Sequence, residues 1–151
     1  MRSLLFLPGN RPSMLMSGTQ LTADALILDL EDAVSIEEKD TARILTRNAI
    51  AFFQYNCPVI VRINGLATPF WQSDLCEILK VKPQYIMVPK IESAEDLIWL
   101  EQELSILETK LKIGPVGVIA MIETARGVME AYHIAVSSRR LKGLALGGED
   151  L

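Results

Sequence analysis

The sequence alternates regularly between short apolar runs and segments with the periodicity of an amphipathic helix. Six apolar runs occur: 3–7 (SLLFL), 25–30 (ALILDL), 59–63 (VIVRI), 85–88 (YIMV), 116–122 (VGVIAMI) and 143–147 (GLALG). Most are continuously apolar rather than alternating, a pattern typical of parallel strands that are covered on both faces. Their centres lie roughly 28 residues apart, which is the length of one β/α unit. The alternation therefore predicts a parallel α/β fold.

Two parallel architectures are compatible with this spacing, an open doubly wound sheet and an eight-stranded β/α barrel. No GxGxxG motif follows the first run, and PGNRP lacks the phosphate-loop pattern, which counts against a nucleotide-binding open sheet. A complete barrel at this spacing needs about 225 residues, whereas this chain has 151 residues and stops directly after the sixth run. We therefore expect residues 1–151 to form a single TIM-type β/α-barrel domain, truncated to about six β/α units and incomplete at its carboxyl end.

Capping residues mark the beginnings of the predicted helices. Ser35, followed three residues later by Glu38, has the spacing of a capping box and predicts a helix over 36–53. Ser93 with Asp96 opens the longest helix in the same way. The buried stripe of that helix is predicted to consist of Leu97, Leu100, Leu104, Leu107 and Leu111.

Charge and apolar run length exclude several classes of protein. The chain has 15 Lys and Arg against 19 Asp and Glu, a net charge of −4, and no basic run that would bind nucleic acid. No apolar stretch approaches the roughly 18 residues of a membrane helix, and the apolar run near the start is too short for a secretory signal. Cys57 and Cys76 lack CxxC spacing and are too few for a disulfide framework. We therefore expect a cytoplasmic protein with neither nucleic acid nor membrane as a partner.

Polar residues that could form a site follow every apolar run. Carboxyl ends of parallel strands meet at the same edge of a β/α fold, so we expect these residues to lie together. Such a concentration of carboxylates repels itself unless a positive group lies among them, which favours a hard divalent cation. Taken singly, each residue is equally compatible with a helix cap or a solvated charge. The set is Arg11, Asp29, Glu31, Asp32, Arg62, Asn64, Lys90, Glu123, Glu149 and Asp150.

The clearest pair in this set is Glu123 and Asp150. They end consecutive predicted strands, and neighbouring strands lie about 4.8 Å apart, so both carboxylates could bind one ion. Mg²⁺ typically takes one or two protein carboxylates, whereas zinc and copper favour Cys and His, which the pattern lacks. Gly147 and Gly148 let the backbone approach a ligand, leaving amides beside Asp150 to bind an anion. The sequence therefore predicts a magnesium site.

Arg62 interrupts an apolar run, where an unpaired guanidinium would be costly to bury. Two interpretations are open: a structural ion pair with Asp29 or Glu31, or a bidentate contact with a substrate carboxylate. His133, the only histidine, lies within a predicted helix and is expected to be a surface or core residue rather than a catalyst.

Six segments of the chain also resemble, in order, the motifs of one enzyme family. They are RSLLFLPGNRP, LILDLEDAVSIEEKDTAR, VIVRING, MVPKIESAEDL, IETARGV and LALGGEDL, and together they extend from Arg2 to Leu151. On these motifs the chain is identified as a member of the citrate lyase β-subunit-like family, within the phosphoenolpyruvate/pyruvate-binding barrels. The resemblance implies a β/α barrel that uses Mg²⁺ to cleave a carbon–carbon bond in a 3-hydroxyacyl thioester.

The resemblance also implies roles for individual residues. Glu123 and Asp150 correspond to the metal ligands of the family, and Glu123 also lies against the substrate. Arg62 corresponds to the residue that holds the carboxylate of the oxo-acid. The resemblance further implies that Glu31 and Asp32 support metal-bound water and that the carrier of the thioester approaches near Arg11. Gly148 and Glu149 correspond to residues that contact the substrate.

The substrate implied first is a citryl thioester, carried on coenzyme A or on an acyl carrier protein and cleaved to oxaloacetate and an acetyl thioester. The alternative is a malyl- or citramalyl-coenzyme A lyase or a related thioesterase. A non-catalytic fragment that binds a thioester or a partner subunit belongs to another functional class. We expect a homo-oligomer or a subunit of a lyase complex.

Overall fold

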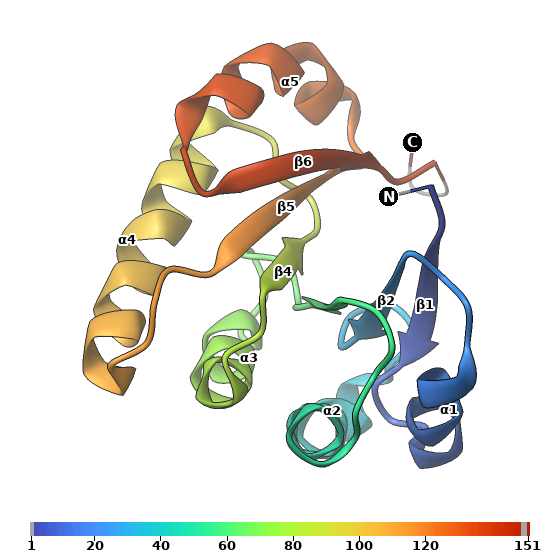
Figure 1. Cartoon of the computed structure of the whole chain (residues 1–151). Helices are drawn as coiled ribbons and strands as arrows, with labels where there is room; N and C mark the ends of the chain where they lie inside the picture. The colour runs from blue at the N-terminus through green and yellow to red at the C-terminus, as the bar shows by residue number, and fades with distance from the viewer. Residues whose placement is uncertain (1, 149–150) are drawn as a thin grey trace.

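The computed structural model describes residues 2–148 and residue 151, and six parallel strands in this part of the chain form one sheet. The strands follow one another across the sheet in the order of the sequence (Figure 1). Every strand lies within two residues of its predicted apolar run. Their bounds are β1 Leu4–Pro8, β2 Ala25–Asp29, β3 Val59–Arg62, β4 Tyr85–Val88, β5 Gly117–Ile122 and β6 Leu141–Leu146.

Helices connect the strands and lie along the outer side of the curved sheet (Figure 1). A doubly wound sheet carries helices on both faces, so this arrangement confirms the prediction of a barrel-type wall over the open sheet. The α-helices of the described residues are α1 Pro12–Ser17, α2 Lys39–Phe52, α3 Trp71–Ile78, α4 Ala94–Leu111 and α5 Ala125–Ser137. Three short 3₁₀ helices join them: η1 Gly18–Gln20, η2 Ile36–Glu38 and η3 Leu79–Val81.

The beginnings of two helices test the predicted capping boxes. At α4 the box is present, because the Ser93 hydroxyl accepts from Asp96 N at 3.2 Å and the Asp96 carboxylate accepts from Ser93 N at 2.9 Å. The box predicted at Ser35 is wrong, since the next three residues form η2 and α2 begins only after them. The Glu38 carboxylate accepts instead from the Ser35 hydroxyl at 3.3 Å and from Asn10 Nδ2 at 2.8 Å. Glu38 thus connects η2 to the loop after β1.

The two faces of the sheet have different surroundings. On the outer face, strand side chains pack with the helices in a large core, which includes the buried Leu97, Leu100 and Leu104 of the predicted α4 stripe. A separate cluster joins β1 and β2 to α1 and α2 and consists of Leu7, Leu15, Leu26, Leu28 and Ala49. The inner face carries a smaller cluster made of Ala25, Ile27, Ile60, Met87 and Met121. This face borders a cavity of about 580 Å³ that residues of β1, β2, β4, β5 and β6 line. The inner face of the curved sheet therefore borders a largely apolar hollow that is open to one side.

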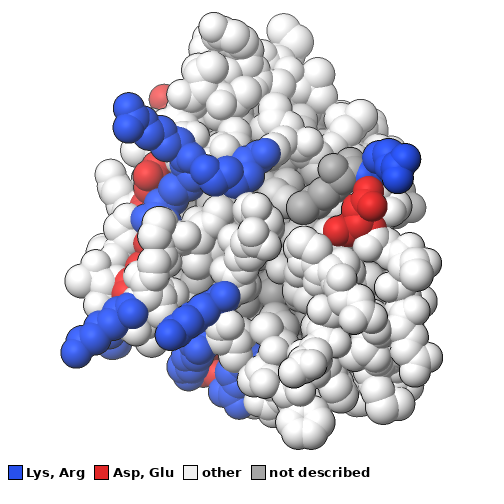
Figure 2. Space-filling model, in the orientation of Figure 1, with Lys and Arg blue, Asp and Glu red and all other residues white. Residues whose placement is uncertain are grey.

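Basic side chains gather on one side of the molecule, over the end of α4 and the beginning of β6 (Figure 2). Lys112 ends α4 and Lys82 ends η3, both with a left-handed backbone, at φ angles of 54° and 53°. The carbonyl groups at the end of a helix favour cations, which is a reason for lysines at these positions.

Three further features concern single residues or the whole chain. No helix among residues 2–148 is long and apolar enough to cross a membrane. Cys57 and Cys76 are free thiols. His133 lies exposed on α5, with its Nδ1 atom 2.9 Å from the Glu130 carboxylate, in agreement with its interpretation as a surface residue.

Candidate functional site

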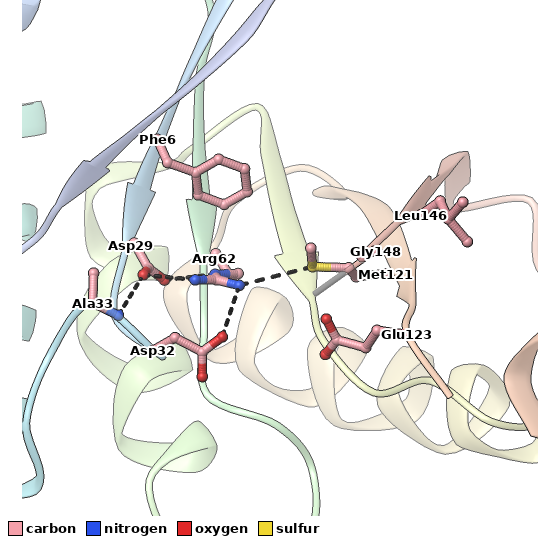
Figure 3. A pocket seen from close by; sticks show the side chains of 10 residues that line it. Phe6, Asp29, Asp32, Ala33, Arg62, Met121, Glu123, Leu146 and Gly148 are labelled. Carbon is pink, nitrogen blue, oxygen red and sulfur yellow. Dashed lines mark hydrogen bonds and ion pairs between the residues drawn. The ribbon is translucent and has the colours of Figure 1, made fainter. Parts of the chain in front are cut away.

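A pocket of about 510 Å³ opens where β1, β2, β3, β5 and β6 end (Figure 3). Carboxyl ends of parallel strands share one edge, so side chains far apart in the sequence meet there, as predicted. Three carboxylates and one guanidinium are among the lining groups. The described residues that line the pocket are Phe6, Asp29, Asp32, Ala33, Arg62, Met121, Glu123, Leu146, Gly147 and Gly148.

Arg62 is the centre of the charged half of the pocket. It stands directly beside Asp29 in the register of β2 and β3. Its Nε atom donates to Asp29 Oδ1 and its Nη2 atom to Asp29 Oδ2, both at 2.7 Å. This two-point contact is the strong, planar pairing that arginine makes with carboxylates. The interpretation of Arg62 as an ion-pair partner of Asp29 is therefore confirmed.

The remaining edge of the guanidinium makes looser contacts. Its Nη1 atom lies 3.2 Å from Glu31 Oε2 and 3.4 Å from Asp32 Oδ2. Its Cζ atom lies 4.9 Å from the centre of the Phe6 ring. Burial alone would lower the pKa of Arg62, but the hydrogen bonds and charge of Asp29, with the charges of Glu31 and Asp32, raise it above its ordinary value. Arg62 is therefore a permanent positive charge in the pocket.

Asp29 was predicted at the site in two ways, as one of the polar residues that follow the apolar runs and as a possible ion-pair partner of Arg62. It is buried and accepts two main-chain hydrogen bonds, from Glu31 N at 2.9 Å and from Ala33 N at 3.0 Å. Asp29 thus fixes both the guanidinium of Arg62 and the loop after β2. The signal for it was its place at the end of an apolar run, next to an arginine-bearing run.

Glu31 lies behind the pocket between two cations. Its Oε1 atom accepts from Lys90 Nζ at 3.1 Å, and its Oε2 atom faces Arg62. Burial raises the pKa of Glu31 above its ordinary value, although the hydrogen bond from Lys90 and the charge of Arg62 act in the opposite direction. Lys90 and Arg62 therefore both stabilise the charged form of Glu31.

Glu123 lies across the pocket from Arg62, beyond Met121 (Figure 3). Its side chain is buried, and its Oε1 atom accepts from the main-chain N–H of Lys90 at 3.0 Å. Its Oε2 atom lies against Gly147, where an added Cβ would come within 2.6 Å of that oxygen. Gly147 is therefore needed to leave space for the Glu123 carboxylate.

Lys39, the first residue of α2, was missed by sequence reasoning. Its Nζ atom donates to the main-chain oxygens of Leu30 at 2.8 Å and Glu31 at 2.7 Å, and lies 5.9 Å from the centre of the Phe70 ring. Burial lowers the pKa of Lys39, although nearby carboxylates, Asp29 first among them, act in the opposite direction. Lys39 fixes the loop that carries the acids, and no local sequence pattern signals such a contact.

The chemistry of the pocket suits a hard cation. Among residues 2–148, the ionisable groups that line it are one guanidinium and three carboxylates, so this part of the lining offers oxygen ligands and contains neither His nor Cys. The carboxylates outnumber the lining cation, which leaves a negative charge for a cation to balance. Within the described residues, no three His, Cys, Asp or Glu side chains form a metal-binding group. Of the predicted ligand pair, Glu123 is at the pocket, whereas Asp150 lies outside the described residues.

The other predicted site residues have different positions. Gly148 lines the pocket, and Asp32 lines it with its side chain 57% exposed. Arg11 is exposed where α1 begins and is not among the lining residues. Glu149 lies outside the described residues. The structure thus brings together Arg62, Asp32, Glu123 and Gly148, with Glu31 directly behind them.

Comparison with known proteins finds relatives of one family, which match this chain over nearly its whole length. Residues 2–151 match the HpcH/HpaI aldolase/citrate lyase family. The citrate lyase subunit beta of Leuconostoc mesenteroides subsp. cremoris is 40% identical, over 99% of this chain and 50% of the relative. The L-malyl-CoA/beta-methylmalyl-CoA lyase of Cereibacter sphaeroides is 35% identical, over 99% of this chain and 48% of the relative. The chain spans about half the length of these curated relatives.

A solved structure has the same fold. The citrate lyase beta subunit from M. tuberculosis, complexed with oxaloacetate and magnesium, superposes with a TM-score of 0.75 and 34% identity. The match covers 98% of this chain and 58% of that structure. Such subunits are TIM-type barrels, in agreement with the sequential parallel strands and outer helices found in this chain. The chain therefore belongs to the HpcH/HpaI aldolase/citrate lyase family.

Proposed function

We propose that this chain forms part of the active site of a Mg²⁺-dependent carbon–carbon lyase that acts on a 3-hydroxyacyl thioester. The substrate we favour is a citryl thioester, cleaved to oxaloacetate and an acetyl thioester. In this reaction the substrate hydroxyl loses its proton, the carbon–carbon bond breaks, and the thioester carbonyl accepts the electron pair as an enolate. Protonation of the enolate carbon then gives the acetyl thioester. The observation that supports it most is the placement of Arg62 and Glu123 across one pocket (Figure 3). Similarity to a citrate lyase beta subunit complexed with oxaloacetate and magnesium adds support.

Glu123 and Asp150 are the residues that we propose as ligands of Mg²⁺. Glu123 suits this role because its carboxylate is buried, held at Oε1 by the Lys90 N–H, and given space at Oε2 by Gly147. A bound Mg²⁺ supplies Lewis acidity, which stabilises negative charge on substrate oxygens. Gly148 and Glu149 are proposed to contact the substrate at the same strand end.

Arg62 is proposed to bind the carboxylate of the oxo-acid. Asp29 occupies its Nε and Nη2 atoms at 2.7 Å. The contacts of Nη1 are longer: 3.2 Å to Glu31, a hydrogen bond of 3.4 Å to Asp32, and one of 3.9 Å to Met121 Sδ. Nη1 is therefore the part of the guanidinium that can exchange its partners for an external carboxylate. Because Asp29 fixes the plane of the guanidinium, the bound oxo-acid would be oriented as well as held.

Glu31 and Asp32 are proposed to support metal-bound water, since both lie beside Arg62 at the end of β2. Arg11 is proposed to lie near the carrier of the thioester, because it is exposed at the same edge of the sheet, where α1 begins. We propose coenzyme A or an acyl carrier protein as this carrier. We propose that the protein is a homo-oligomer or a subunit of a lyase complex, and that it is located in the cytoplasm.

Malyl- or citramalyl-coenzyme A cleavage is the second candidate, favoured by the 35% identity to a malyl-CoA/methylmalyl-CoA lyase. A related thioesterase would use the same pocket and release free coenzyme A without carbon–carbon cleavage. Binding of a thioester or of a partner subunit without turnover is a candidate of another class. Product analysis with citryl-, malyl- and citramalyl-coenzyme A separates these candidates.

The experiment that tests the proposal combines Mg²⁺ calorimetry with an assay for oxaloacetate release from citryl-coenzyme A. We expect Glu123→Ala and Asp150→Ala each to weaken Mg²⁺ binding about tenfold or more. His133→Ala is the control, because this side chain is exposed on α5 and does not line the pocket. Unchanged Mg²⁺ titrations in both acid variants would refute the metal site, and oxaloacetate release that survives in both would refute the mechanism.

A further inference from the structure

Lys90, which follows β4, connects two carboxylates of the site through different groups. Its main-chain N–H donates to Glu123 Oε1 at 3.0 Å, and its Nζ atom donates to Glu31 Oε1 at 3.1 Å. Its backbone is left-handed, with a φ of 55°, and its side chain is 46% exposed. The main-chain N–H of Lys90 thus contacts Glu123, and its ammonium group contacts Glu31 on the Arg62 side of the pocket.

Glu31 is shared between Lys90 and Arg62. Its side chain is 9% exposed, and its two oxygens lie 3.1 Å from Lys90 Nζ and 3.2 Å from Arg62 Nη1. The contact with Lys90 is a hydrogen bond, whereas Oε2 accepts no hydrogen bond from the described residues. Lys90 is thus the better-aligned partner of Glu31. Without its ammonium group, the buried carboxylate would be left to pair with Arg62, because an unpaired buried charge is costly.

We propose that Lys90 is a positioning residue that holds Glu31 away from full pairing with Arg62, so that Nη1 of Arg62 can donate to the carboxylate of an oxo-acid. This inference rests on the proposed function, in which Arg62 binds that carboxylate. Asp29 already occupies the other edge of the guanidinium at 2.7 Å. A second tight carboxylate at Nη1 would compete directly with the oxo-acid for the same N–H groups.

The test measures binding of oxaloacetate in the presence of Mg²⁺, and binding of Mg²⁺ alone, by calorimetry. Lys90→Gly removes the ammonium group but keeps the main-chain N–H, and glycine accepts the left-handed backbone without strain. Lys112→Gly is the matched control, because Lys112 is also exposed and left-handed but lies at the end of α4, whereas Lys90 donates to Glu31 and Glu123. We expect Lys90→Gly to weaken oxaloacetate binding about tenfold. Mg²⁺ binding should not change in Lys90→Gly, and Lys112→Gly should change neither.

A second variant tests the route through Glu31. Glu31→Gln combined with Lys90→Gly removes the charge that would compete for Arg62. Oxaloacetate affinity should then return to within about twofold of Glu31→Gln alone, since the two residues act through one contact. A merely structural role of Lys90 would not be reversed by this change. Unchanged oxaloacetate binding in Lys90→Gly, an equal loss of Mg²⁺ binding, or no recovery in the double variant would overturn the inference.

Failure of the proposed function has a separate signature, which is that the unmodified chain binds no oxaloacetate with Mg²⁺. In that case a crystal structure of the Lys90→Gly chain decides the role of Lys90. If Glu31 has moved and accepts a hydrogen bond from Nη1 of Arg62, the positioning role is supported. Glu31 in an unchanged place overturns it.

Discussion

The pairing of Asp29 with Arg62 gives the sharpest prediction for stability. Asp29→Ala removes a side chain that is 1% exposed and that accepts two hydrogen bonds from Arg62 at 2.7 Å and two from main-chain N–H groups at 2.9 and 3.0 Å. Removing one partner of a buried ion pair typically costs about 3–5 kcal/mol, because the other charge stays buried without compensation. Arg62 retains Glu31 at 3.2 Å and Asp32 at 3.4 Å. We therefore expect the lower end, a loss of about 3 kcal/mol in the free energy of unfolding.

Urea unfolding followed by far-ultraviolet circular dichroism measures this loss. With an m-value of about 2 kcal/mol/M, a loss of about 3 kcal/mol lowers the midpoint by about 1.5 M. Asp40→Ala is the matched control, because Asp40 also pairs with an arginine, Arg43, at 2.6 Å, but its side chain is 88% exposed. Exposed pairs contribute little, so the control should change stability by less than about 1 kcal/mol.

A double-mutant cycle with Arg62→Ala completes the test. If the two side chains stabilise the fold as a pair, the double variant loses less stability than the sum of the two single variants. The reasoning is refuted if the two losses add, or if Asp29→Ala destabilises the chain no more than Asp40→Ala does.

Three further predictions concern the site and the core. Arg62→Lys keeps the charge but loses the planar two-point contact, so calorimetry should show oxaloacetate affinity reduced about tenfold; equal affinity would make Arg62 structural only. Gly147→Ala should weaken Mg²⁺ binding, because the new Cβ would lie 2.6 Å from Glu123 Oε2. Gly148→Ala should not, since a Cβ there meets no atom of the described residues within 4 Å, and equal Mg²⁺ titrations of the two variants would contradict this. Burial raises the pKa of Tyr55 to about 12. Since an unfolded tyrosine ionises at about pH 10, stability should fall as the pH rises through that interval, and Tyr55→Phe should reduce the fall in urea midpoints compared at about pH 9 and pH 11.

The sequence by itself determined the elements of this fold and the edge at which the site lies. Strand positions could be read from continuous apolar runs, and the capping box of α4 from Ser93 and Asp96, because both signals depend on neighbours along the chain. Family motifs pointed to Arg62 and Glu123, and the common edge of parallel strands explains why both line one pocket. The box at Ser35 failed because Glu38 finds a partner in the loop after β1, which is distant in sequence.

Only the tertiary structure decided which groups hold the site residues in place. Asp29 is the close, two-point partner of Arg62 because the register of β2 and β3 places the two residues side by side. The helices lie on the outer side of the sheet and not on both faces, and this arrangement distinguished a barrel wall from an open sheet. Lys39, Lys90 and Gly147 acquire their roles through contacts with segments far along the chain. Local patterns record how a segment buries its own apolar face, whereas these contacts arise only when separate strand ends are brought to one edge.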